Sequence, residues 1–143
     1  MPNGNVHRAV GAAAGAGSAY VVSSSQEPLC RLLEVIGGAI GGNFGARLPD
    51  LFDPATSPNH RSTGHAVVPA AAVLSWYAEQ APRWIQALRI KAEELAAKSE
   101  ASENMLLALI YTALEWLARM AAGAVSGIAV GHASHLALDA CTP

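Results

Sequence analysis

Three glycines recur at intervals of four residues within one predicted helix, and this repeat restricts the fold more than any other sequence feature. The helix is predicted over residues 28–47, and the repeat consists of Gly37, Gly41 and Gly45. Residues four apart share one helix face. Glycine inside a helix costs about 1 kcal/mol relative to alanine, so such a face indicates close approach of a second helix. The predicted partner is the small-residue face of the first helix, formed by Gly11, Gly15 and Ser18.

The rest of the chain also predicts helices. Valine, isoleucine and threonine never gather in the alternating runs that are typical of strands. The predicted helices span about 7–22, 28–47, a segment from Ser62 or Thr63 with a kink near Pro69, a fresh helix after Pro82, and 104–138. Residues 48–63 are predicted to form one long loop. We therefore expect an all-α fold, a compact bundle of about four to five helices in a single domain over residues 1–143.

Composition excludes some partners. The net charge is −2 and only 6% of residues are aromatic, so neither a basic field nor a stacking surface indicates nucleic acid. Cys30 and Cys141 are too few for a disulfide framework, and neither has a second cysteine at metal-ligand spacing. Both are predicted to be buried small apolar residues in a reducing compartment.

Residues 105–130 form the best candidate for a membrane-spanning helix, since a span needs about 20 mostly apolar residues. Glu115 and Arg119 lie in the middle of this stretch and are four residues apart, so they can pair on one helix face. Two interpretations stay open: a solvated or interfacial salt bridge on a soluble helix, or a helix inside a membrane bundle.

The five histidines fall into three short polar islands, together with the three aspartates. The islands lie at the start of the first helix, in the long loop, and near the end of the last helix. Their candidate metal ligands are His7; Asp50, Asp53, His60 and His65; and His132, His135 and Asp139.

The third island is the best supported, because His132, His135 and Asp139 project from one helix face. Two imidazoles and a carboxylate in an apolar helix require something that satisfies them, and a metal ion does so directly. Eight ligands are too many for one catalytic zinc, so the set predicts either two ions or one ion with orienting carboxylates. This ligand chemistry favours a divalent transition metal: zinc, with manganese or iron as alternatives.

Each island also has a simpler interpretation. His7 could be a helix-end histidine, Asp50 and Asp53 could cap turns, and His132 could line a pocket. Arg61, beside His60, could bind a phosphate or serve a structural role.

Three runs of sequence together resemble a known bacterial family, the membrane-bound metal-dependent hydrolases. The runs are Leu-Pro-Asp-Leu-Phe-Asp-Pro, His-Arg-Ser-Thr-Gly-His, and Gly-His-Ala-Ser-His-Leu-Ala-Leu-Asp-Ala-Cys-Thr-Pro. The resemblance implies a helical protein associated with the inner membrane on its cytoplasmic side, with a hydrolase activity. By position, it places the motif residues at His7, Asp50, Asp53, His60, His65, His135 and Asp139. The chain is less hydrophobic than typical members, which leaves a soluble cytoplasmic form open.

The first functional hypothesis is therefore a metal-dependent hydrolase of a phosphoester or related ester, with a small-molecule or lipid-like substrate. Asp53 would accept a proton and Arg61 would hold the anionic group. The alternative is a non-enzymatic, membrane-associated metal-binding protein with a structural or interaction role, because a metal can stabilise a fold without catalysis. The glycine-lined helices could also meet across two copies in a homo-oligomer.

Overall fold

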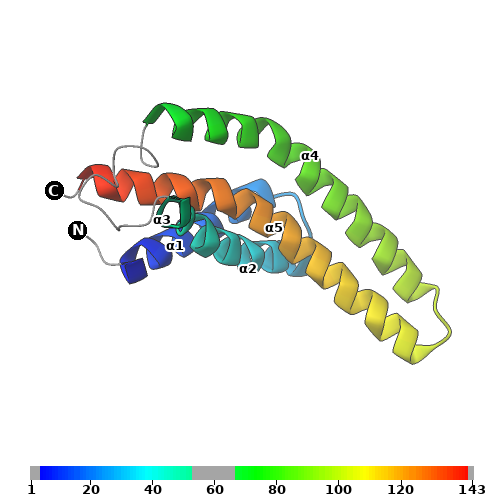
Figure 1. The fold of residues 1–143 in the computed structure, drawn as a ribbon. Coiled ribbons are helices and arrows are strands. Elements are labelled where there is room, and N and C mark those ends of the chain that lie inside the picture. Colours follow the sequence, from blue (N-terminus) through cyan, green and yellow to red (C-terminus); the bar gives the residue numbers. More distant parts are fainter. Residues whose placement is uncertain (1–3, 53–66, 142–143) are drawn as a thin grey trace.

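Helices make up most of the described part of the chain, which is residues 4–52 and 67–141 of a computed structural model. They are α1 (Gly4–Val22), α2 (Pro28–Gly45), α3 (Leu48–Phe52), α4 (Val67–Glu100) and α5 (Met105–Cys141). Helices α1, α2 and the second half of α5 pack against one another, and α4 packs along α5 (Figure 1). No strand occurs in these residues, so the predicted all-α bundle of four to five helices is confirmed.

Glycines on both sides of α2 allow its two neighbours to approach at backbone distance. A Cβ atom at Gly37, Gly41 or Gly45 would overlap the backbone of α5, and one at Gly38 or Gly42 would overlap that of α1. The predicted partner of the glycine repeat was therefore wrong. Gly11 and Gly15 of α1 do pack on α2, but against the second row of glycines. Spacing identifies which residues share a face, and it does not identify the helix that this face meets.

Helix α4 runs through Pro82 without a break, so the prediction of a fresh helix there was wrong. Proline inside a helix removes one hydrogen bond and costs about 3 kcal/mol. Burial on both sides of the proline offsets this cost, because Ala81 and Ile85 pack with Ala122 of α5. The tertiary contact thus holds a helix that its local sequence would interrupt.

The predicted loop over residues 48–63 is only partly described. Its first residues form α3, a single short helix, so the loop prediction was wrong for residues 48–52. The remainder of that loop, and the predicted helix start at Ser62 or Thr63, lie outside the described residues.

Charged side chains are buried near the end of the bundle that is far from α3. Glu34 is 1% exposed and accepts hydrogen bonds from Nε and Nη2 of Arg89, at 2.9 and 2.6 Å. Arg119 Nε lies 3.1 Å from Glu115 Oε1, so the predicted pair forms. The side chains of this pair are only 8% and 16% exposed, however, so a fully solvated salt bridge is excluded.

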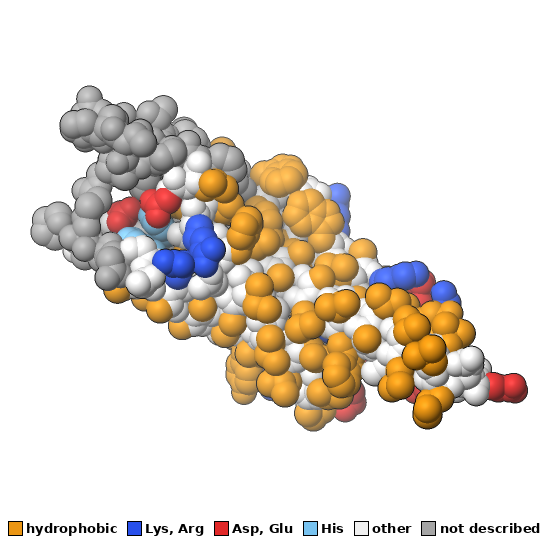
Figure 2. All heavy atoms as spheres, turned by 60° about the horizontal axis from the view of Figure 1, so that its bottom comes forward, with side chains coloured by type: hydrophobic (Ala, Val, Ile, Leu, Met, Phe, Trp, Pro, Cys, Tyr) orange, Lys and Arg blue, Asp and Glu red, His pale blue; other side chains and the backbone are white. Residues whose placement is uncertain are grey.

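A broad apolar surface remains exposed on the outer sides of α1, α2 and the first half of α5 (Figure 2). On α2 it is a helical stripe that consists of Leu29, Leu32, Ile36, Ile40 and Phe44. By length and composition, α5 is apolar enough to cross a membrane, and only 17% of its most apolar 18-residue window is buried inside the chain.

Candidate metal centre

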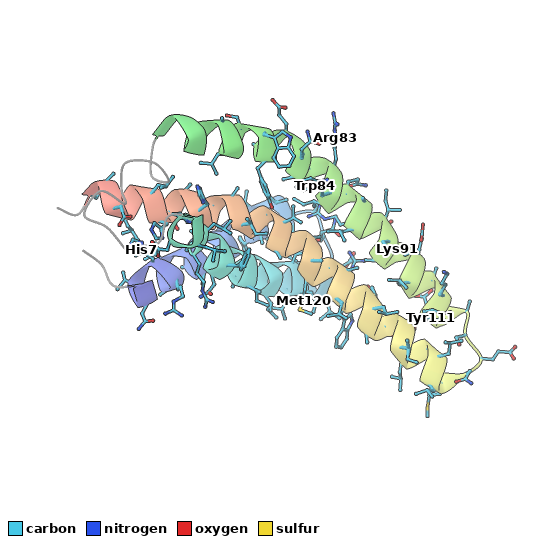
Figure 3. All side chains as sticks on the ribbon, in the orientation of Figure 1. His7, Arg83, Trp84, Lys91, Tyr111 and Met120 are labelled. Carbon is cyan, nitrogen blue, oxygen red and sulfur yellow. The ribbon has the colours of Figure 1, made fainter. Side chains whose placement is uncertain are left out.

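Three side chains from opposite ends of the sequence meet at the end of the bundle where α3 lies. They are His7 from the first turns of α1, and His135 and Asp139 from the last turns of α5. Each offers one ligand atom, and these atoms all lie within 4.8 Å of one another. His7 lies between α1 and the C-terminal part of α5 (Figure 3). Among the described residues, this group has the composition of a metal site.

Glycine packing brings the two histidines together. Gly11 lies one helical turn after His7, and Gly131 lies one turn before His135. A Cβ atom at either glycine would overlap the backbone of Gly42 in α2. Both outer helices therefore touch the same point of α2, and the side chains one turn further along come into contact. The imidazole rings stack, with centroids 4.0 Å apart and an angle of 21° between their planes.

Asp139 bridges the two imidazoles. Its Oδ1 lies 3.3 Å from His7 Nε2, and its Oδ2 lies 3.2 Å from His135 Nε2. His7 and His135 are 5% and 1% exposed, so the carboxylate faces them in a largely water-free position. Asp50 of α3 adds a second carboxylate oxygen, 3.5 Å from His135 Nε2, although its side chain is 57% exposed.

The backbone decides the tautomer of His135. Its Nδ1 lies 2.6 Å from the carbonyl oxygen of Ala46, and a carbonyl can only accept a hydrogen bond. Nδ1 therefore carries a proton, and in the neutral ring Nε2 presents its lone pair. That lone pair faces oxygen atoms of both Asp139 and Asp50. Acceptors that face one another in a buried place require a cation between them, either a proton on Nε2 or a metal ion.

This arrangement fits a divalent metal ion. A backbone carbonyl that binds the second ring nitrogen of a histidine is the usual way to orient such a ligand. Two imidazoles and one carboxylate equal the number of protein ligands in catalytic zinc sites, where a further position is left for water or substrate. The half-exposed Asp50 lies on the side where that position could be reached.

The predicted site residues have different outcomes. His7, His135 and Asp139 come together, and Asp50 lies beside them. His132 is half-buried and does not belong to this group of three. The remaining candidates, Asp53, His60, Arg61 and His65, lie outside the described residues.

The cysteines are separate from this group. Cys30 is half-buried and Cys141 is exposed, so the prediction that both are buried was wrong. Burial nevertheless raises the pKa of the Cys30 thiol, which keeps it protonated at neutral pH.

Sequence reasoning missed two features of the site. One is the Ala46 carbonyl, which no side-chain pattern could reveal. The other is a pair of arginines, Arg8 and Arg47, which line a cavity next to Asp50. Their signal was weak but present, because Arg8 directly follows His7 and Arg47 precedes Asp50 by three residues in a chain with only nine basic residues.

Comparisons with protein families, with curated proteins and with solved structures find no match for this chain. The hydrolase family suggested by the sequence motifs therefore stays a prediction.

Proposed function

We propose that this protein is a metal-dependent hydrolase of a phosphoester or related ester. The observation that carries the proposal is the convergence of His7, His135 and Asp139 around one buried point, with ligand atoms within 4.8 Å. A divalent ion held there would supply Lewis acidity and activate water for attack on an ester. Zinc fits the ligand set best, and manganese or iron would also suit mixed imidazole and carboxylate ligands.

The residues of the chain divide the remaining tasks. The Ala46 carbonyl keeps the proton of His135 on Nδ1, so that Nε2 faces the metal position. Asp139 fixes the orientation of both imidazoles, because one of its oxygen atoms lies near Nε2 of each ring. Asp50 is close to His135 and is also half open to solvent, so it is the described carboxylate best placed to accept a proton from a water molecule.

A location at the inner membrane, with the site on the cytoplasmic side, is part of the proposal. Its support is the exposed apolar stripe on α2 together with the long apolar helix α5. Such a contiguous apolar surface is typical of a membrane or partner contact. Retention of the protein in the membrane fraction after an alkaline carbonate wash is the expected result. Release into the soluble fraction would exclude a spanning α5.

The test of the enzyme proposal compares Asp139→Asn with the wild-type protein. Elemental analysis should find about one zinc, manganese or iron per wild-type chain. The variant keeps the side-chain shape but removes the charge, so it should lose most of the metal and the phosphodiesterase activity towards bis-p-nitrophenyl phosphate. The control is Glu79→Gln, which removes an exposed carboxylate of α4. Metal bound stoichiometrically without activity on any ester would favour the structural alternative, and no metal at all would exclude both.

A further inference from the structure

Next to the proposed metal centre lies a cavity of about 520 Å³, and it shares two of its lining residues with that centre. One is Asp50, whose carboxylate lies 3.5 Å from His135 Nε2. The other is Ala46, whose carbonyl oxygen binds His135 Nδ1. A molecule in this cavity would therefore lie against the open side of the metal centre.

Two arginines give the cavity its charge. Arg8 comes from α1 and Arg47 from the junction between α2 and α3, and among the described residues of the lining Asp50 is the one acidic residue. Figure 2 shows basic side chains beside histidine and acidic side chains at this end of the molecule. Among the described residues of the lining, the basic charge thus exceeds the acidic charge.

Both guanidinium groups have N–H donors that remain available to a ligand. Arg8 uses Nε and Nη2 to bind the Gly4 carbonyl and the Asn5 side chain, which orients it but leaves further N–H groups. Within residues 4–52 and 67–141, no acceptor lies within hydrogen-bond distance of the Arg47 guanidinium, which is exposed. Neither arginine is neutralised by a carboxylate in that part of the chain. Planar guanidinium forks match phosphate and carboxylate groups.

The other side of the cavity is apolar. Phe44, Leu48 and Leu51 line it, and Phe44 and Leu51 are 52% and 66% exposed. Phe44 also ends the exposed apolar stripe of α2. An apolar group that enters the cavity can therefore continue along this stripe, while its charged end meets the arginines.

The geometry points to a binding site for an anionic amphiphile, in which Arg8 and Arg47 hold a phosphate group and Phe44, Leu48 and Leu51 hold its apolar substituent. The inference rests on the proposed function in one respect only: the amphiphile is a substrate if the neighbouring metal centre hydrolyses its phosphate ester. Binding itself requires no metal.

The test measures binding to metal-free protein, treated with a chelator and kept in a non-ionic detergent. Octyl phosphate, inorganic phosphate and octanol are titrated separately by calorimetry. Octyl phosphate should bind saturably and at least tenfold more tightly than inorganic phosphate, which lacks the apolar part, or octanol, which lacks the charge. Equal affinity for octyl phosphate and either of the other two probes would overturn the inference.

Two variants identify the site. The double substitution Arg8→Gln and Arg47→Gln should weaken octyl phosphate binding by about tenfold or more, because two charge-assisted contacts are lost. The control Arg83→Gln removes an exposed arginine of α4, far from the cavity, and should leave the affinity unchanged (Figure 3). Equal affinities in all three proteins would overturn the assignment. Elemental analysis of the same proteins before the chelator treatment reports separately on the metal centre, so failure of one proposal is distinguishable from failure of the other.

Vesicles separate a lipid source from a soluble one. Metal-free protein should bind vesicles of phosphatidylcholine with phosphatidic acid more tightly than vesicles of phosphatidylcholine alone, and the double arginine variant should lose this preference. Binding of octyl phosphate without any preference between the vesicles would assign the site to soluble amphiphiles and would overturn a lipid ligand.

Discussion

The two ends of the bundle both bury charged side chains, but they satisfy them in different ways. At one end Glu34 is held by two nitrogen atoms of Arg89, and Arg119 is held by Glu115 and the Gln26 side chain. Each acid there meets an arginine that is always charged. At the other end two imidazoles meet the carboxylates of Asp139 and Asp50, and Nε2 of His135 can share either a proton or a metal ion with these oxygen atoms.

This difference assigns a structural role to one end of the bundle and a possible ligand-binding role to the other. The end with Glu34, Arg89, Glu115 and Arg119, called the arginine end, is complete without any ligand. It ties α2 to α4 and ties α5 to the turn between α1 and α2. It also caps α1, since Nη2 of Arg89 donates to the Val22 carbonyl at the C-terminal end of that helix. The end with His7, His135 and Asp139, called the histidine end, could hold a metal ion. A buried cluster of histidine and carboxylate groups is therefore a candidate metal site, whereas a buried arginine–carboxylate pair is not.

The largest expected effect comes from removing the buried ion pair between Glu34 and Arg89 at the arginine end. Glu34→Ala leaves Arg89 without its buried partner and should lower the free energy of unfolding by about 4 kcal/mol. Denaturant unfolding in mild detergent measures the change. Glu94→Ala is the control, because Glu94 pairs with Lys91 on the surface of α4. The exposed pair should contribute nothing measurable. Equal effects of the two substitutions would contradict a structural role for the buried pair.

The second prediction sharpens the contrast between the ends. Zinc at a hundredfold excess over its Kd should stabilise the metal-free wild-type protein by about 2.7 kcal/mol, because it binds the folded state. Asp139→Asn should abolish most of this response. Glu34→Ala should retain it, although the variant starts from a lower stability. A zinc response that survives in Asp139→Asn and disappears in Glu34→Ala would reverse the roles assigned to the two ends.

The third prediction separates helix packing from ligand chemistry at the histidine end. Gly131→Ala adds a methyl group that overlaps the Gly42 backbone, so it should cost about 2 kcal/mol and separate His7 from His135. The midpoint temperature of thermal unfolding and the metal content per chain should both fall. In the matched control, Gly17→Ala, the added methyl group meets open space inside α1. It should stabilise the protein by about 0.5–1 kcal/mol through helix propensity. A stable, metal-loaded Gly131→Ala protein would contradict the packing argument.

The smallest effect tests the contact of α4 with α5 between the two ends. The Tyr77 hydroxyl donates a hydrogen bond to the Val125 carbonyl, so Tyr77→Phe should cost about 1 kcal/mol. Burial raises the pKa of Tyr77 from its ordinary value of 10.0 to about 12. Between these values the unfolded state loses the proton that the folded state keeps, so stability should fall as pH rises through this window. The variant should lack this part of the decrease, as measured by unfolding at pH 9 to 12.

The sequence predicted the helices correctly where the preferences of neighbouring residues determine the backbone conformation. Pro28 opens α2 as expected, and the absence of alternating runs correctly excluded strands from the described residues. His135 and Asp139 were predicted on one face because four-residue spacing is a property of any helix. Pro82 shows the limit of such reasoning, since packing of Ala81 and Ile85 on α5 overrides a local helix breaker.

Residue identity and spacing are enough to show that this chain forms helices, that small residues line their faces, and that histidine and aspartate gather in a few polar islands. The contacts between distant parts of the chain could be identified only from the tertiary structure. The glycine repeat of α2 meets α5 and not α1, Glu34 finds Arg89, and Arg8 and Arg47 line one cavity beside Asp50. Helical periodicity is a local property of the backbone, whereas these contacts depend on which faces of distant helices are buried together, and side chains from the whole chain compete for that burial.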